Sequence, residues 1–375
     1  MQTFDDIRFY DAPEVNDAIM EYARHPMFKA LLQFTFPEKS EEEITATLLS
    51  CRSIQDFQER VIYHSVGKVI EKSTEGFSTS GFEDLDRKQS YLYLSNHRDI
   101  ILDTSFINFA LMNHEQIMTA SAIGDNLVKK SFLLVLSKLT RNFLVQRSLS
   151  LREMLASSKK LSLYIQTLIG QKQSIWMAQR EGRTKDGYDR TQQGVLKMLA
   201  MNRGKEPAMV YLKKMRIVPV AISYEFDPTD IFKVPELIAK SEDVEYIKSS
   251  NEDFNSIMRG ALGNKKRVHI SLGTIENVVF ERIDAKPISE NDKLQELAQE
   301  IDRCIHSIYK LWPSNLVAYD LYHDSTKYVH AYTEKDKRAF ERRIERRIPA
   351  ETEVARESFL LMYANPVINK EKLAT

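Results

Sequence analysis

The sequence predicts an α/β protein with a central, mostly parallel sheet that is flanked by helices and preceded by an N-terminal helical bundle. Two observations support this fold class. Short β-prone runs alternate with longer helical stretches from about residue 88 onward, which is typical of a largely parallel sheet. Before that point, apolar residues recur with helical spacing. The β-prone runs are residues 91–95, 116–123, 142–147, 174–180, 216–226 and 267–273, and the main helical stretches between them are residues 150–170, 191–201 and 229–248.

The first 75 residues are expected to form a small bundle of helices. Ser40 with Glu43, and Ser53 with Asp56, have the spacing of capping boxes that begin two of them. A Ser-, Thr- and Gly-rich stretch, residues 73–81, is expected to be a loop. One apolar helical face is formed by Val15, Ala18, Ile19, Tyr22 and Ala23.

The chain is therefore divided into three parts. Residues 1–80 are the N-terminal helical bundle, residues 85–315 the α/β domain, and residues 316–375 a charged, helical C-terminal extension. Near the end of the α/β domain, Ser289 is expected to begin a long helix that Pro313 ends.

Composition excludes several classes of protein. The 375 residues are 43% hydrophobic and 28% charged, which is typical of a folded globular chain. Fifty-three basic residues balance 53 acidic ones, and this balance argues against a nucleic-acid-binding protein. The two cysteines and the spacing of the histidines give no zinc or disulfide pattern, so no metal or other cofactor is expected. The N-terminus lacks the features of a secretory signal, and no apolar run is long enough to span a membrane.

His97 is the first candidate catalytic residue. It follows the β-prone run 91–95, and parallel sheets place their ligands at the carboxyl ends of strands. An imidazole is a common general base near neutral pH, and a carboxylate can hold its tautomer, here Asp103 or Asp99. The alternative is a structural histidine that caps the following helix or pairs with Asp103 for structure.

Three further runs end in residues that are suited to binding a substrate. Arg147 ends one run, and Glu181, Gly182 and Arg183 follow another in a polar turn. A guanidinium offers a bidentate fork that fits a phosphate. Pro219 lies within an apolar run and suggests a strand edge or a rigid bend. Taken alone, Arg147 is better explained as an ordinary surface arginine at a strand end, and the turn with Arg183 is equally well explained as a solvated turn with ordinary surface charge.

In this order, the four runs resemble the sequence blocks of the glycerolipid acyltransferase superfamily, which includes lysophosphatidate and glycerol-3-phosphate acyltransferases. Asn96, His97 and Asp103 match the Asn-His-x4-Asp block with one extra residue before the aspartate. Arg147 matches the second block, Glu181, Gly182 and Arg183 match the third in part, and Pro219 matches the fourth. The resemblance covers about residues 88–226, and the helical bundle before it is similar to the soluble glycerol-3-phosphate branch.

The resemblance implies the chemistry of fatty acyl transfer. Acyl-CoA or acyl-carrier protein would supply the acyl group, and His97, oriented by Asp103, would take the proton from an acceptor hydroxyl. The acceptor would be a glycerol-phosphate or a lysophospholipid. It would be bound by Arg147, Glu181, Gly182 and Arg183, with Asn96, Arg98 and Pro219 as further substrate-binding positions. Two alternatives are a lyso-aminolipid acceptor without phosphate and a non-catalytic lipid-binding protein of this fold.

The substrates that the resemblance implies also suggest where the protein acts. We expect a cytoplasmic protein, peripheral at the inner face of the membrane. Within residues 334–347, Phe340 and Ile344 lie on one face of a basic helix, which is typical of a helix that lies on anionic lipid. The alternative is a solvated surface helix with charge pairs along it.

Overall fold

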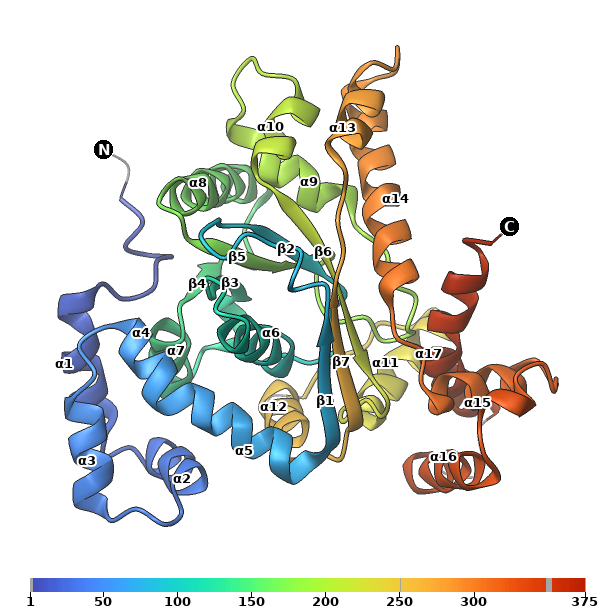
Figure 1. Cartoon of the computed structure of the whole chain (residues 1–375), viewed down its shortest axis with the longest axis horizontal. Coiled ribbons are helices and arrows are strands. Elements are labelled where there is room, and N and C mark those ends of the chain that lie inside the picture. The colour runs from blue at the N-terminus through green and yellow to red at the C-terminus, as the bar shows by residue number, and fades with distance from the viewer. Residues whose placement is uncertain (1–2, 250, 349–352, 375) are drawn as a thin grey trace.

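The computed structural model describes residues 3–249, 251–348 and 353–374, and a twisted seven-stranded sheet crosses its centre (Figure 1). The strand order is β1-β7-β6-β2-β5-β3-β4. Neighbouring strands are parallel except β6 and β7, which are antiparallel, so the predicted mostly parallel sheet is confirmed. The strands are β1 (Thr74–Ser80), β2 (Leu92–Ser95), β3 (Thr119–Gly124), β4 (Asn142–Val145), β5 (Ser174–Ala178), β6 (Ile217–Tyr224) and β7 (Lys266–Leu272).

The six predicted strands are all present, and one prediction of a loop is wrong. Residues 74–80 form β1, which pairs in parallel with β7 at one end of the sheet. The side chains of Ser78 and Ser80 both hydrogen-bond to the ring of His269 on β7, at 2.7 and 3.0 Å. His269 lies far along the chain from residues 74–80. The polar composition of this segment alone therefore does not indicate that it pairs as a strand.

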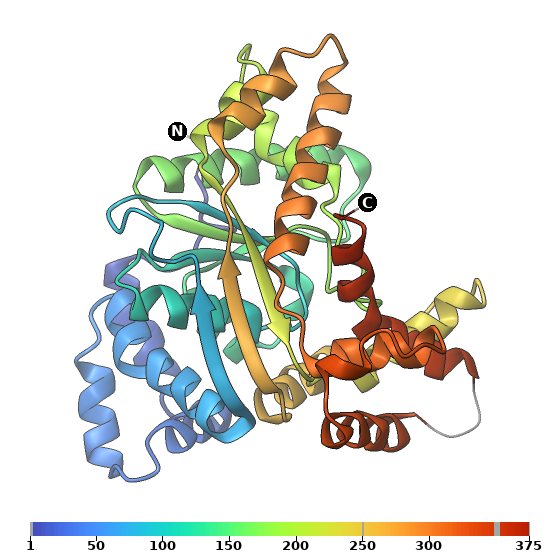
Figure 2. The same ribbon diagram turned by 45° about the vertical axis from the view of Figure 1, so that its right-hand side comes forward.

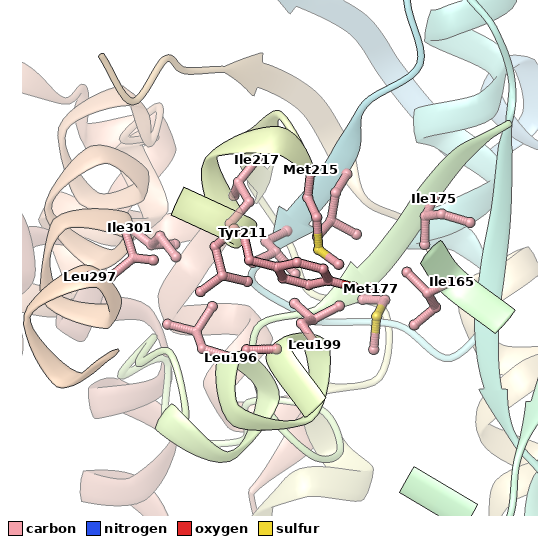
Figure 3. Packing of buried hydrophobic residues seen from close by; sticks show 14 of the residues in the cluster. Ile165, Ile175, Met177, Leu196, Leu199, Tyr211, Met215, Ile217, Leu297 and Ile301 are labelled. Carbon is pink, nitrogen blue, oxygen red and sulfur yellow. The ribbon is translucent and has the colours of Figure 1, made fainter. Parts of the chain in front are cut away.

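One face of the sheet is covered by helices that follow the strands (Figure 1). Apolar side chains from alternate strand positions, such as Ile175, Met177 and Ile217, meet Leu196 and Tyr211 there (Figure 3). This cluster fixes the strand register, because a slip of one residue would turn the whole set outward. The helices of this face are α8 (Leu151–Gly170), α9 (Gln193–Leu199), α10 (Ala208–Lys214), α13 (Asn277–Asp284) and α14 (Glu290–Ile308).

The opposite face is covered by α5 (Tyr63–Ser73) and α6 (Leu102–Asn113), with α12 (Glu252–Leu262) beside α5. The predicted N-terminal helices lie next to α5 and α6. The buried cluster that these N-terminal helices form includes Leu139 of α7. Ser40 and Ser53 cap α3 and α4 as predicted, and a π-helical turn at Gln58–Ile62 joins α4 to α5. The remaining helices of this region are α1 (Ala12–Tyr22), α2 (Pro26–Thr35), α3 (Glu41–Leu49), α4 (Ile54–Phe57) and α7 (Ser131–Leu139).

The C-terminal helices gather at the opposite side from the N-terminal bundle (Figure 2). They are α15 (Pro313–Tyr322), α16 (Glu334–Arg347) and α17 (Glu353–Glu371), and they pack against α11 (Asp230–Ser241). Pro313 begins α15 and does not end the preceding helix, which stops at Ile308. Phe340 and Ile344 of α16 are buried in this cluster, so the interpretation of α16 as a lipid-facing amphipathic helix is wrong.

Candidate functional site

His97 lies at the carboxyl edge of the sheet, on the loop between β2 and α6. Strand β2 is central, with β5 on one side and β6 on the other, so its end is flanked by side chains from both neighbours. The loop is irregular from Asn96 to Ile101, and the helix begins at Leu102. His97 also lines a large cavity at this edge.

Asp103 is the partner of His97. The Nδ1 atom of His97 lies 2.7 Å from Oδ2 of Asp103, whose side chain is fully buried. The same oxygen accepts hydrogen bonds from the backbone N–H groups of Arg98 (2.6 Å) and Asp99 (3.0 Å). The loop wraps around the carboxylate, and in this way it accommodates the extra residue between His97 and Asp103. The predicted hydrogen bond is confirmed.

Asp99, the alternative partner for His97, has a different role. Its Oδ1 accepts hydrogen bonds from the backbone N–H groups of Ile101 (3.0 Å) and Leu102 (2.9 Å), so it caps the start of α6. Burial, together with the nearby charge of Asp103, raises the pKa of Asp99. Gly260 of α12 lies so close that a Cβ atom there would be 2.1 Å from Asp99 Oδ2. Asp99 therefore fixes the loop and the packing of α12.

Two residues that sequence reasoning did not identify complete the surroundings of the pair. The hydroxyl of Tyr224, at the end of β6, donates to Asp103 Oδ1 at 2.9 Å. The Trp176 ring lies edge-on to His97, with centroids 5.5 Å apart, and its Nε1 donates to Ser95 Oγ. Both residues lie on the strands next to β2. Strand adjacency is the signal that would have found them.

The second and third sequence blocks bring positive charge to the same cavity. Arg147 follows β4 and forms an ion pair with Glu181, and both line the cavity. Arg183 lines it too. Its buried Nη1 has no hydrogen-bond partner among the described residues, and this leaves a donor available. Gly182, with a φ of +69°, gives the turn a left-handed conformation that other residues rarely adopt.

Lys185 adds a further cation to this turn. Burial lowers its pKa, and an ion pair of 2.9 Å with Glu236 opposes that effect. Its Nζ is the nearest atom that a Cβ on Gly182 would meet. The turn therefore concentrates positive charge at one side of the cavity.

Three predicted substrate-binding residues lie outside the cavity lining. The Asn96 amide bonds the backbone of Ile222 in both directions, at 2.7 and 3.0 Å. Arg98 is buried and donates to Asp189 at 2.7 Å. Pro219 is buried near the start of β6, opposite Leu94 of β2 in the register. The contacts of Asn96 and Arg98 hold the loop in place, and Pro219 packs within the sheet, so we assign the three residues to these structural tasks and not to contacting a substrate.

The cavity has a volume of about 1180 Å³, which exceeds the roughly 300–1,000 Å³ of a typical small-molecule site. Its walls are mostly apolar, and the charged side chains that line it include those of Arg147, Glu181 and Arg183. Such a shape suits a long apolar substrate with one polar end. Within the described ranges, no group of three His, Cys, Asp or Glu side chains is arranged to hold a metal ion. None of the described helices is both long and apolar enough to cross a bilayer.

Comparisons with known proteins agree with the four sequence blocks. Residues 77–223 match the family model described as Acyltransferase, and this segment contains all four blocks. The resemblance to the acyltransferase superfamily is confirmed by this match. No curated protein sequence matches the chain. One similar solved structure is the 1-acyl-sn-glycerophosphate (LPA) acyltransferase PlsC from Thermotoga maritima, with a TM-score of 0.37 and 10% identity, over 78% of this chain and 93% of that one.

Proposed function

We propose that this chain, whose residues 77–223 form a domain of the acyltransferase family, moves a fatty acyl group from acyl-CoA or acyl-carrier protein to the hydroxyl of a glycerol-phosphate or lysophospholipid acceptor. One observation carries the proposal. His97 is held by a buried carboxylate, and it lines an apolar cavity together with Arg183, whose buried Nη1 has no hydrogen-bond partner among the described residues.

His97 acts as the general base. Because Asp103 engages Nδ1, the other ring nitrogen, Nε2, is left to accept the proton of the acceptor hydroxyl. The hydroxyl oxygen attacks the thioester carbonyl, the C–S bond breaks, and the imidazolium returns the proton to the leaving thiolate. The Asp103 carboxylate stabilises the imidazolium in between. Positioned general-base catalysis typically contributes about a hundred- to ten-thousand-fold.

The cations of the second and third blocks bind the acceptor phosphate. Arg183 has a buried N–H group with no partner in the part of the chain that the structure describes, and such a group is costly unless a ligand satisfies it. Arg147 is paired with Glu181, so the phosphate competes with that carboxylate or adds to the pair. The thioester donor is already activated, so this mechanism uses no metal.

A lyso-aminolipid acceptor remains the alternative, because the apolar walls of the cavity would accept its chains equally well. The free donor of Arg183 favours a phosphate. The alternative of a non-catalytic lipid-binding protein was supported by the extra residue between His97 and Asp103. The 2.7 Å contact of Asp103 with His97 removes that support.

The start of α8 gives the protein a surface for a membrane. Leu151 is 85% exposed and Leu155 63% exposed, next to the exposed Arg152. They adjoin Leu149 and Met154, which line the cavity. Apolar side chains flanked by basic ones favour an interface with anionic lipid. A protein bound there would bring the part of the cavity lined by Leu149 and Met154 to the bilayer, from which a lipid acceptor would arrive.

The test is an acyl-transfer assay with labelled acyl-CoA and acyl-carrier protein. Glycerol 3-phosphate, lysophosphatidate and a lyso-aminolipid serve as acceptors. Transfer to a phosphorylated acceptor is the expected result. Transfer to the lyso-aminolipid alone would exclude the phosphate site, and binding of lipid without transfer to any acceptor would establish the non-catalytic alternative.

A further inference from the structure

The cavity contains a further guanidinium, that of Arg180, which directly precedes Glu181 of the third sequence block. The Nε atom of Arg180 is buried and has no hydrogen-bond partner among the described residues. The Arg147 side chain, by contrast, is paired with Glu181. A buried donor destabilises a fold unless an acceptor satisfies it. Arg180 is therefore in place for an acceptor that the described part of the protein does not supply.

The chain places Arg180 next to the loop that carries His97. Strand β5 pairs in parallel with β2 (Figure 1), and the N–H group of Gln179, directly after β5, donates to the carbonyl oxygen of Ser95 at 2.8 Å. The N–H group of Thr184 donates to the carbonyl oxygen of His97, also at 2.8 Å. The turn that includes Arg180 is thus held against the histidine loop by a hydrogen bond at each end.

The side chains of β5 lead along the cavity wall to Arg180. Trp176 and Ala178 are two residues apart on the strand, so they lie on the same face of the sheet, and both line the cavity. The Trp176 ring lies edge-on to His97, with centroids 5.5 Å apart. Arg180 is the next residue in this alternation and lines the cavity as well. A cation therefore belongs to the same wall as the general base.

Acyl transfer creates a negative charge close to His97. When the acceptor hydroxyl attacks the thioester carbonyl, an electron pair of the C=O bond moves to oxygen and forms an oxyanion. This oxygen is bonded to the carbon that is under attack, and His97 takes the proton of the attacking hydroxyl, so the oxyanion forms near the imidazole. A fixed hydrogen-bond donor at such an oxyanion typically contributes about a hundred- to a thousandfold to kcat.

We propose that Arg180 is a catalytic residue that donates to the oxyanion of the tetrahedral intermediate. The proposal rests on the proposed acyl transfer and adds to it a group that stabilises the intermediate. When the C–S bond breaks, the electron pair on oxygen re-forms the carbonyl, and the thiolate leaves and takes the proton from His97. A donor that is needed only in the intermediate has no partner in the free protein, as is observed for Nε of Arg180.

The first experiment compares the wild type with Arg180→Met, which keeps an unbranched apolar stem and removes the guanidinium. We expect kcat to fall at least about a hundredfold, with little change in the KM for either substrate, because the interaction is made only in the intermediate. The Tm should equal or exceed that of the wild type, because a buried donor without a partner is removed. Arg190→Ala, at an exposed arginine that does not line the cavity, should match the wild type in kcat.

The second experiment is chemical rescue of Arg180→Ala, whose shortened side chain leaves room for a free guanidinium ion. Guanidinium chloride is added at millimolar concentrations at which circular dichroism shows an intact fold. The rate of Arg180→Ala should rise several-fold with the added ion, whereas the rates of the wild type and Arg190→Ala should not rise. A purely structural arginine would not give this dependence on the added ion.

Three results would overturn the proposal. They are a wild-type kcat in Arg180→Met, a higher KM for the acceptor with unchanged kcat, and a lower Tm together with no rescue by guanidinium. The second would assign Arg180 to a charged group of the acceptor, and the third would assign it to the fold. Failure of the proposed function is a distinct result, because the wild type would then acylate no acceptor, and both proposals would fall.

Discussion

The Asp103 carboxylate is the buried centre of the site. Its Oδ2 accepts from His97 and two backbone N–H groups, and its Oδ1 accepts from Tyr224. A buried carboxylate with this many donors is fixed in position, and it fixes the imidazole in turn. Burial and the adjacent carboxylates raise the pKa of Tyr224 well above its ordinary value, so its hydroxyl remains a donor at any working pH.

Tyr224→Phe removes one hydrogen bond to a buried carboxylate and leaves Oδ1 without that donor. Such a change costs about 1–3 kcal/mol. We expect kcat to fall about tenfold, with a small change in KM and a lower Tm. Steady-state kinetics and thermal unfolding measure both effects. If the Tm of the variant falls while its kcat stays at the wild-type value, Tyr224 contributes to the stability of the fold and not to catalysis.

Arg183→Ala would remove the proposed charge-assisted contact with the acceptor phosphate, and a contact of this kind is worth about 1.5–3 kcal/mol. The KM for a phosphorylated acceptor should therefore rise about ten- to a hundredfold, while the KM for the donor stays the same. The control is Arg190→Ala, an exposed arginine of the same loop that does not line the cavity. Equal effects in the two variants would contradict a phosphate contact at Arg183.

Among the elements, strand β1 depends on contacts that no local pattern shows. The other six strands were predictable because each lies within a short β-prone run between longer helical stretches. Thr74–Ser80 is mostly polar, and its main polar contact, His269, lies 191 residues beyond Ser78. His269 is buried between two serine hydroxyls. Burial, with the charge of Lys310 adding, lowers its pKa to about 4 from an ordinary 6.5.

This shift predicts a pH dependence of stability. Between about pH 6.5 and pH 4, the unfolded chain binds a proton at His269 that the folded chain does not, so stability falls as the pH falls through this window. His269→Gln removes that contribution. The loss of Tm from pH 7 to pH 5 should be smaller in the variant, and parallel curves for the two proteins would rule out a role for His269.

The sequence blocks identified four residues that the structure brings close to one another. His97, Arg147 and Arg183 line one cavity, and Asp103 is hydrogen-bonded to His97. The contribution of Tyr224 could not be predicted, because it lies 121 residues from Asp103 and meets it only through the pairing of β2 with β6.

At the scale of the whole molecule, the C-terminal helices pack against the residues that directly follow the third sequence block. Gly187, with a φ of +74°, lies against α17 so closely that a Cβ would be 2.2 Å from the carbonyl oxygen of Met362. Asn365 donates to the backbone of Asp186 at 2.6 Å.

The apolar face of α16 was predicted to contact lipid because a sequence pattern cannot distinguish a bilayer from a neighbouring helix. Here its partners are Phe359 and Tyr363 of α17.

The proposed membrane surface on α8 predicts a specific effect of charge. Leu155→Asp should reduce sedimentation with anionic phospholipid vesicles several-fold, because it places a carboxylate among the exposed apolar residues. Val278→Asp, at a side chain of α13 that is equally exposed at 63%, should bind as the wild type does. Equal binding by both variants would show that α8 does not contact the vesicle.

The most direct test of the account is the rate of acyl transfer to lysophosphatidate by the wild type and by His97→Ala, with circular dichroism to confirm that both are folded. The account predicts transfer by the wild type and a loss of at least about a hundredfold in the variant, the smallest contribution expected of a positioned general base. A folded His97→Ala protein with a rate within about tenfold of the wild type would contradict the account.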